Sequence, residues 1–164
     1  MKTAIIYYSR TGNTRTAAKL LEDKLRGKHI DVDVVEIEAV KNPGFFTAGS
    51  ASMKQKELPI KNTGYNLNPY DTLIVGSPTW AGLPSPFIKT FFNSAKNAKG
   101  KKAALFITGS AKPEAHEKTK ECMKQNLEHA GVIVSDAFLF LQMVKGNIRD
   151  GEQQIDEFLQ QAIP

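Results

Sequence analysis

Residues 3–14 read TAIIYYSRTGNT, and this stretch decides the fold of the chain. Its first six residues are mostly apolar, which is typical of a strand that helices cover on both faces. Residues 9–14 are polar, contain one glycine, and lead directly into a helical pattern over residues 14–26. The apolar residues of that pattern recur at the spacing of one helical face: Ala17, Ala18, Leu21 and Leu25. The stretch therefore predicts a buried strand, a tight loop and an amphipathic helix.

Strand and helix patterns alternate along the rest of the chain. Further strands are predicted at residues 31–37, 72–76, 103–108 and 132–141, and further helices at 46–56, 86–95, 114–130 and 151–162. Strands that alternate with helices are typical of a doubly wound α/β fold with a parallel sheet. Right-handed crossovers then place every strand-to-helix loop at the carboxyl edge of that sheet. The length of 164 residues suits a single domain over residues 1–164.

The polar loop after the first strand has the composition of an anion site. Four of its side chains offer hydrogen-bond donors: Ser9, Thr11, Asn13 and Thr14. Gly12 lets the backbone turn tightly and approach a ligand closely. The free N–H groups and the dipole at the start of the following helix favour a negative charge. The loop therefore predicts a phosphate-binding site.

Other patterns narrow this prediction. A capped helix would need only one hydroxyl, whereas the loop offers several. The loop does not match the GxxxxGK[ST] pattern of nucleoside-triphosphate sites or the GxGxxG pattern of dinucleotide sites. Arg10 is the only charged residue in the loop, and it either faces the anion or points into water.

Composition excludes several other classes of protein. No apolar run approaches the roughly 20 residues that span a bilayer, which predicts no membrane association. The net charge of +5 comes from scattered lysines without interleaved aromatic residues, which argues against nucleic-acid binding. Cys122 is the only cysteine, so the chain has no internal disulfide, and we expect the protein in the reducing cytoplasm. Cys122 itself is expected as a half-buried helix residue. The three histidines are far apart, so no metal site is predicted.

Two motifs together resemble the flavodoxin-like FMN-binding family. They are YYSRTGNT at residues 7–14, after the first strand, and GSPTWAGLP at residues 76–84, after the third. The resemblance covers essentially the whole chain. It implies a three-layer α/β/α sandwich with a five-stranded parallel sheet of order 2-1-3-4-5. It also implies FMN as the cofactor, bound at the switch point between strands 1 and 3.

The resemblance also implies which residues bind the cofactor. Three loops would supply them: Ser9, Arg10, Thr11, Gly12, Asn13 and Thr14 for the phosphate, Pro78, Thr79, Trp80, Ala81 and Gly82 beside the isoalloxazine, and Thr108, Gly109, Ser110, Ala111 and Lys112 on its other side. Trp80 either stacks on the flavin or packs against neighbouring helices. In flavodoxins a peptide in the second loop turns over on reduction, and Gly82 makes such a flip cheap at Ala81–Gly82 or at the next peptide.

The chain departs from the flavodoxin pattern in two respects. Its isoelectric point of about 9.3 is basic, whereas electron-carrier flavodoxins usually have an acidic surface. The loop after the fourth strand contains no aromatic ring except His116, which we expect on a helix surface. The outer flavin face is therefore open, or is covered by residues 45–58 or by a second subunit.

The favoured function is an electron carrier that works through FMN between redox partners. The alternative is an FMN-dependent NAD(P)H:quinone-type oxidoreductase, because an open flavin face could admit a nicotinamide or a quinone. No side chain is predicted to act as a catalytic acid or base. The basic charge favours an acidic redox partner and a salt-sensitive encounter. A phosphorylation receiver is disfavoured because the strands do not end in clustered acidic residues, and a module that has lost its flavin is disfavoured by the intact loop.

Overall fold

The computed structural model describes residues 1–149 and 151–163 and has one mixed sheet. The strands are β1 (Lys2–Tyr7), β2 (Asp31–Glu36), β3 (Thr72–Trp80), β4 (Leu83–Pro84), β5 (Lys102–Gly109), β6 (Ile133–Val144) and β7 (Asn147–Ile148). The long strands are parallel neighbours in the order β2-β1-β3-β5-β6. This confirms the predicted order 2-1-3-4-5 and the flavodoxin-like fold.

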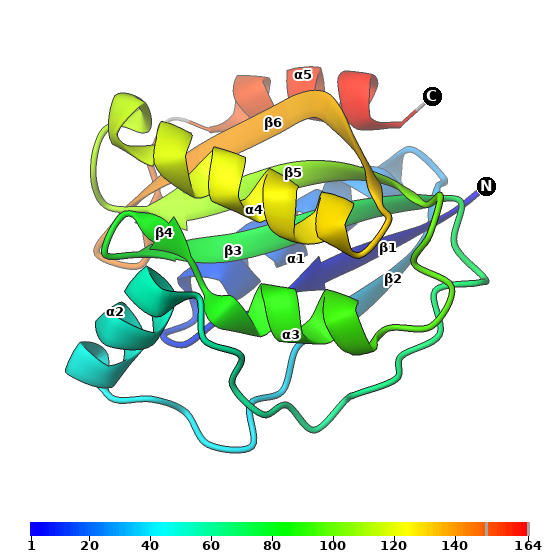
Figure 1. Cartoon of the computed structure of the whole chain (residues 1–164). Coiled ribbons are helices and arrows are strands. Elements are labelled where there is room, and N and C mark those ends of the chain that lie inside the picture. Colours follow the sequence, from blue (N-terminus) through cyan, green and yellow to red (C-terminus); the bar gives the residue numbers. More distant parts are fainter. Residues whose placement is uncertain (150, 164) are drawn as a thin grey trace.

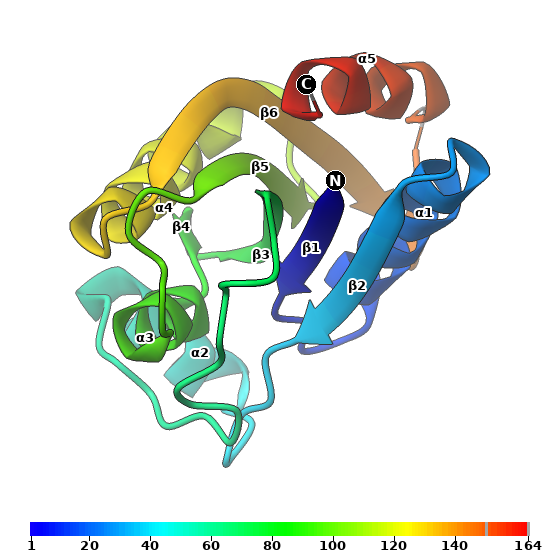
Figure 2. The same cartoon turned by 90° about the vertical axis from the view of Figure 1, so that its right-hand side faces the viewer.

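Helices cover both faces of the sheet, as Figure 2 shows. Helices α1 (Asn13–Gly27) and α5 (Glu152–Ala162) lie on one face, and α3 (Pro86–Ser94) and α4 (Glu117–His129) lie on the other. A short 3-10 turn, η1 (Pro113–His116), precedes α4. Helix α2 (Phe45–Lys54) lies near the carboxyl ends of the strands, at the lower left in Figure 1.

The two halves of the core are packed differently. Three large rings of α3, Phe87, Phe91 and Phe92, are buried against one face of the sheet. On the other face, the small side chains of Ala17 and Ala18 let α1 pack against the sheet. Because the central strands β1, β3 and β5 are buried between two helical layers, the loops at their carboxyl ends are the parts of these strands available to a ligand.

One predicted strand was too short. The third strand was expected to end at residue 76, but β3 continues to Trp80 and turns back into β4. Trp80 pairs with Leu83, so Ala81 and Gly82 form a two-residue hairpin turn. Both turn residues have positive φ, +50° and +77°, as the turn favoured by twisted strands requires. The loop predicted after the third strand is therefore a short hairpin.

The boundaries of the other predicted elements agree to within a few residues, apart from the division of the predicted helix 114–130 into η1 and α4. The short antiparallel strand β7 was not predicted. Within the described part of the chain, no helix is long and apolar enough to cross a membrane. Cys122 lies half-buried on α4 as expected, and burial raises the pKa of its thiol.

Candidate cofactor site

The predicted site residues converge because β1, β3 and β5 are neighbours in the sheet. Tyr7 pairs with Gly76 and Gly76 pairs with Phe106, so the three strands end at one edge. The loops that follow β1 and β5 lie on either side of the β3–β4 hairpin. A direct contact links the first and third groups of residues, since the hydroxyls of Thr14 and Thr108 lie 2.9 Å apart.

The first loop is folded around a buried hydroxyl. The Oγ of Ser9 accepts hydrogen bonds from the main-chain N–H groups of Gly12, at 3.1 Å, and Arg15, at 3.3 Å. Gly12 is in the left-handed region, with φ of +99°, where a β-carbon would be strained. It directly precedes α1, which has no side-chain cap.

The start of α1 leaves donors for an anion. Among the described residues, the main-chain N–H groups of Asn13 and Thr14 have no acceptor. Two free N–H groups at the positive end of a 15-residue helix form a cradle that fits a phosphate. The residues present therefore fit the phosphate of FMN, and Thr11 and Asn13 lie on the more exposed side of this loop.

Not every predicted phosphate donor is free. The Thr14 side chain is buried, and its hydroxyl is already bonded to Thr108. Arg15, the next cation along the chain, is engaged by Glu36, whose carboxylate accepts from its Nε at 2.9 Å. The same carboxylate accepts a hydrogen bond from the Tyr7 hydroxyl. Burial, and to a smaller extent the negative charge of Glu36, raise the pKa of Tyr7 to about 12. Arg15 therefore neutralises Glu36 and is not positioned by this contact to bind a phosphate.

Arg10 neither points simply into water nor pairs with an acid. Its guanidinium carbon lies 5.8 Å from the centre of the Phe45 ring, within cation–π range. Its Nε is buried without a hydrogen-bond partner among the described residues. A buried donor without a partner is costly, which is consistent with a ligand that completes the site.

Two hydroxyls from different helices hold the β3–β4 hairpin. Ser52 of α2 is 2.9 Å from the carbonyl oxygens of both Trp80 and Pro84. Thr119 of α4 donates to the carbonyl of Gly82, also at 2.9 Å. The Gly82 carbonyl belongs to the peptide that follows Ala81–Gly82. Of the two peptides predicted to flip, Ala81–Gly82 is thus the one whose carbonyl is not held by Thr119.

Trp80 packs against the core as well as facing the site. Its ring lies edge-on to Tyr8, at 5.5 Å between centres, and to Phe87, at 6.4 Å. Trp80 also lines a cavity, so the same side chain can pack against the core and contact a ligand. The stacking of Trp80 on the flavin stays a prediction.

That cavity has a volume of about 650 Å³ and lies between α2 and the hairpin. Its wall is mainly apolar, with Phe45, Phe46 and Met53 from α2 and Trp80 and Ala81 from the hairpin. Arg10 lines the same cavity and supplies a positive charge. The segment at residues 45–58 was one of the predicted covers for the outer flavin face, and its helix does lie against the hairpin tip, although Phe45 and Phe46 remain exposed.

The prediction for His116 was wrong. This histidine was expected on a helix surface, but it is buried behind the loop at residues 109–112, with 3% of its surface exposed. Its Nδ1 lies 2.9 Å from the hydroxyl of Thr79, and its ring stacks on Phe140. Burial lowers its pKa, so the imidazole is neutral at pH 7. The polar sequence around residue 116 carries no signal of this burial, because the covering residues come from other elements.

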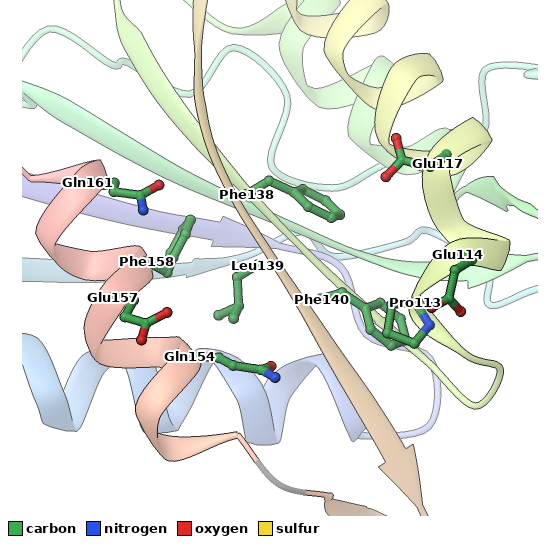
Figure 3. Close-up of a pocket in the computed structure, with 10 residues that line it drawn as sticks. All are labelled: Pro113, Glu114, Glu117, Phe138, Leu139, Phe140, Gln154, Glu157, Phe158 and Gln161. Carbon is green, nitrogen blue, oxygen red and sulfur yellow. The ribbon is translucent and has the colours of Figure 1, made fainter.

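A second cavity, of about 500 Å³, lies along the outer edge of β6. Figure 3 shows Phe138 and Phe140 of β6 facing η1 and α4, with Leu139 facing α5. Glutamates from the helices line it as well: Glu114, Glu117 and Glu157. This cavity is separate from the predicted cofactor residues, but Phe140 connects the two because it also contacts His116.

Comparison with known proteins agrees with this geometry. A family model described as NADPH-dependent FMN reductase matches residues 1–144. The chain is 27% identical to the flavodoxin of Maridesulfovibrio salexigens over 96% of this chain and 92% of that protein. It is 28% identical to an NAD(P)H dehydrogenase (quinone) of Acidovorax ebreus over 81% of this chain and 68% of that protein.

A solved structure of a flavoprotein in complex with FMN, from Lactobacillus acidophilus, superposes with a TM-score of 0.64 at 22% identity. The superposition covers 85% of this chain and 91% of that one, and it shows the shared fold. The converging loops, the free N–H groups at the start of α1 and the family match lead to one assignment. The chain belongs to the NADPH-dependent FMN reductase family, has the flavodoxin-like fold, and is an FMN-binding flavoprotein.

Proposed function

We propose that the protein carries electrons between redox partners through its bound FMN. The observation that supports this most is the apolar surface of α2 beside the hairpin tip. Phe45, Phe46 and Met53 expose 74%, 88% and 68% of their surface. Large exposed apolar side chains that gather beside a functional site are typical of a docking surface. A partner bound there would lie next to Trp80 and Ala81, at the predicted flavin edge.

The similarity to a flavodoxin supports the same role. The match covers 92% of the flavodoxin relative, whereas the match to the quinone dehydrogenase covers 68% of that protein. FMN supplies the one- and two-electron chemistry, so the chain itself has to bind and orient the cofactor. We assign the phosphate to the start of α1 and the ring to the space between the hairpin and residues 109–112.

Charge favours an acidic partner. Exposed lysines flank the site on two elements, with Lys54 and Lys56 at the end of α2 and Lys112 in the loop after β5. Attraction between such a surface and an acidic protein accelerates encounter and is weakened by salt. The partner we propose is therefore an acidic redox protein that touches the apolar side chains of α2.

The cavity beside the hairpin favours a second candidate, an FMN-dependent NAD(P)H:quinone-type oxidoreductase. At about 650 Å³ it has the size of a small-molecule site, with a mainly apolar wall and two cationic side chains, Arg10 and Lys54. A nicotinamide or a quinone seated there would lie beside Thr79 and Trp80. The similarity to the quinone dehydrogenase supports this candidate as well.

Anaerobic mixing of the purified holoprotein separates the two functions. If the protein is a carrier, excess NADPH or NADH leaves the flavin absorbance unchanged for minutes, whereas a reduced acidic [2Fe–2S] ferredoxin bleaches it rapidly. If it is an oxidoreductase, NADPH or NADH bleaches the flavin within seconds and menadione restores the absorbance. Rapid bleaching by NADPH or NADH would overturn the carrier proposal.

Matched variants locate the docking surface. Phe46→Ser and Lys54→Gln should each slow reduction by the ferredoxin, and the effect of Lys54→Gln should vanish at high salt. Lys99→Gln is the control, because Lys99 is exposed at the opposite end of the strands, next to Gly131. Equal rates for all three variants and the unmodified protein would place docking elsewhere.

A further inference from the structure

His116 occupies a junction between the two predicted walls of the flavin pocket. It ends η1, just after the loop at residues 109–112, and its side chain turns inward. Thr79, near the end of β3, belongs to the opposite wall and lines the cavity beside the hairpin. A single side chain thus contacts elements from both walls.

The contacts of the ring are specific on three sides. The Nδ1 atom lies 2.9 Å from the Thr79 hydroxyl, and the ring centre lies 4.2 Å from that of Phe140 in a stacked arrangement. On the third side, a β-carbon placed on Gly109 would come within 2.5 Å of Cε1. Residue 109 has no positive φ, so it is the imidazole, and not backbone strain, that requires glycine there.

The hydrogen-bonding state of the ring also matters. A neutral imidazole has one N–H donor and one lone pair. Nδ1 shares a hydrogen with the Thr79 hydroxyl, and Nε2 is buried without a well-formed hydrogen bond to the described residues. A main-chain hydrogen bond with Ala111 partly opposes the lowering of the imidazole pKa by burial. If Thr79 donates to Nδ1, its hydroxyl can only accept further hydrogen bonds. If Nδ1–H donates to Thr79, the hydroxyl proton stays available to an acceptor in the cavity that Thr79 lines.

We propose that His116 is a positioning residue for the flavin ring, which sets the spacing between the hairpin and residues 109–112 and orients the hydroxyl of Thr79. This inference rests on FMN binding and is independent of whether the protein is a carrier or an oxidoreductase. It concerns the ring of the cofactor only, because the hydrogen bond and the ring stacking of His116 involve Thr79 and Phe140, which lie outside residues 9–14. Changes at His116 should therefore alter ring binding and leave the phosphate contribution intact.

The test compares two variants of the site, His116→Phe and His116→Gln, with the control variant His129→Gln. Phe keeps a flat ring on Phe140 but cannot bond Thr79, Gln keeps a polar group without the ring, and His129 is exposed at the end of α4. We expect both His116 variants to weaken FMN and riboflavin binding by the same factor, about tenfold, as for a lost hydrogen bond with its packing. Both should also shift the midpoint potentials of bound FMN, and His129→Gln should do neither.

Three results would overturn the proposal. They are unchanged affinities and potentials in His116→Phe, a loss confined to FMN with riboflavin binding intact, and equal effects in His129→Gln. If both His116 variants fail to fold, Thr79→Val provides the same measurement, because it removes the hydroxyl and leaves the imidazole in place. Unchanged potentials in folded Thr79→Val would then overturn the proposal. Failure to bind any flavin in the unmodified protein would instead contradict the cofactor assignment.

Discussion

The hydroxyls of Thr14 and Thr108 lie 2.9 Å apart although 94 residues separate them in the chain. Both side chains are buried, with 1% and 2% of their surface exposed. One belongs to the first turn of α1 and the other to the end of β5, so this bond links the proposed phosphate loop to the strand on the far side of β3. The shape of the proposed cofactor site thus depends on a contact that crosses the switch point of the sheet.

Removal of one hydroxyl of this pair should lower the free energy of unfolding more than removal of both hydroxyls. Thr14→Val leaves the Thr108 hydroxyl buried without a partner, and we expect the free energy of unfolding of the apoprotein to fall by about 1–3 kcal/mol. The double variant Thr14→Val, Thr108→Val should recover most of this loss, because two valines pack in nearly the same shape. Urea denaturation measures both values, and strictly additive losses would contradict the account.

The left-handed backbone at Gly12 should tolerate no side chain. We expect Gly12→Ala to destabilise the protein by about 1–2 kcal/mol, since φ there is +99°. It should also weaken FMN more than riboflavin, because the loop that faces the phosphate would shift. Gly27→Ala, at the far end of α1, is the matched control. A β-carbon at Gly27 meets nothing within 4 Å, and that variant should bind FMN normally.

The hairpin turn predicts a redox effect at Gly82. Gly82→Ala places a side chain at φ of +77° and should change the separation between the two one-electron midpoint potentials of bound FMN. Thr119→Val releases the carbonyl of Gly82 and should have a smaller effect, because the Ala81–Gly82 peptide carries the predicted flip. A reductive titration with dithionite gives both separations. If Gly82→Ala titrates like the unmodified protein, no flip depends on this glycine.

Burial of His116 predicts a loss of stability in acid. Its pKa is lowered in the folded state relative to its ordinary value of 6.5, so the unfolded chain binds more protons at low pH. This contribution to stability is fully present above pH 6.5 and is lost as the pH falls toward the folded pKa. Urea denaturation from pH 8 to pH 4 should show a shallower acid loss for His116→Gln than for the unmodified protein. An identical pH dependence in His129→Gln and His116→Gln would mean that other groups cause it.

The fold was largely predictable because its signals are local. Continuous apolar runs such as residues 3–8 mark buried parallel strands, and the stripe from Ala17 to Leu25 marks α1. The extension of β3 to Trp80 was missed for an equally physical reason. Pro78 and Pro84 argue against strand pairing, and the turn has Ala81 where a hairpin signal would place asparagine or aspartate.

The geometry of the candidate site was predictable only in part. The convergence of the three loops could be predicted because the sheet topology brings the strand ends together, whatever their side chains. The burial of His116 depends on Gly109 and Phe140, which come from other elements, and no sequence pattern near residue 116 reports them. The Thr14–Thr108 hydrogen bond could not be predicted from the sequence either, since both threonines were predicted to bind the cofactor.

Equilibrium titration of the apoprotein with FMN and with riboflavin tests the cofactor site most directly. The two ligands differ only by the phosphate, which we place on the free N–H groups of Asn13 and Thr14 at the start of α1. Two charge-assisted hydrogen bonds should make FMN bind at least about 100-fold more tightly than riboflavin. Equal dissociation constants for the two ligands would contradict the phosphate site at residues 9–14.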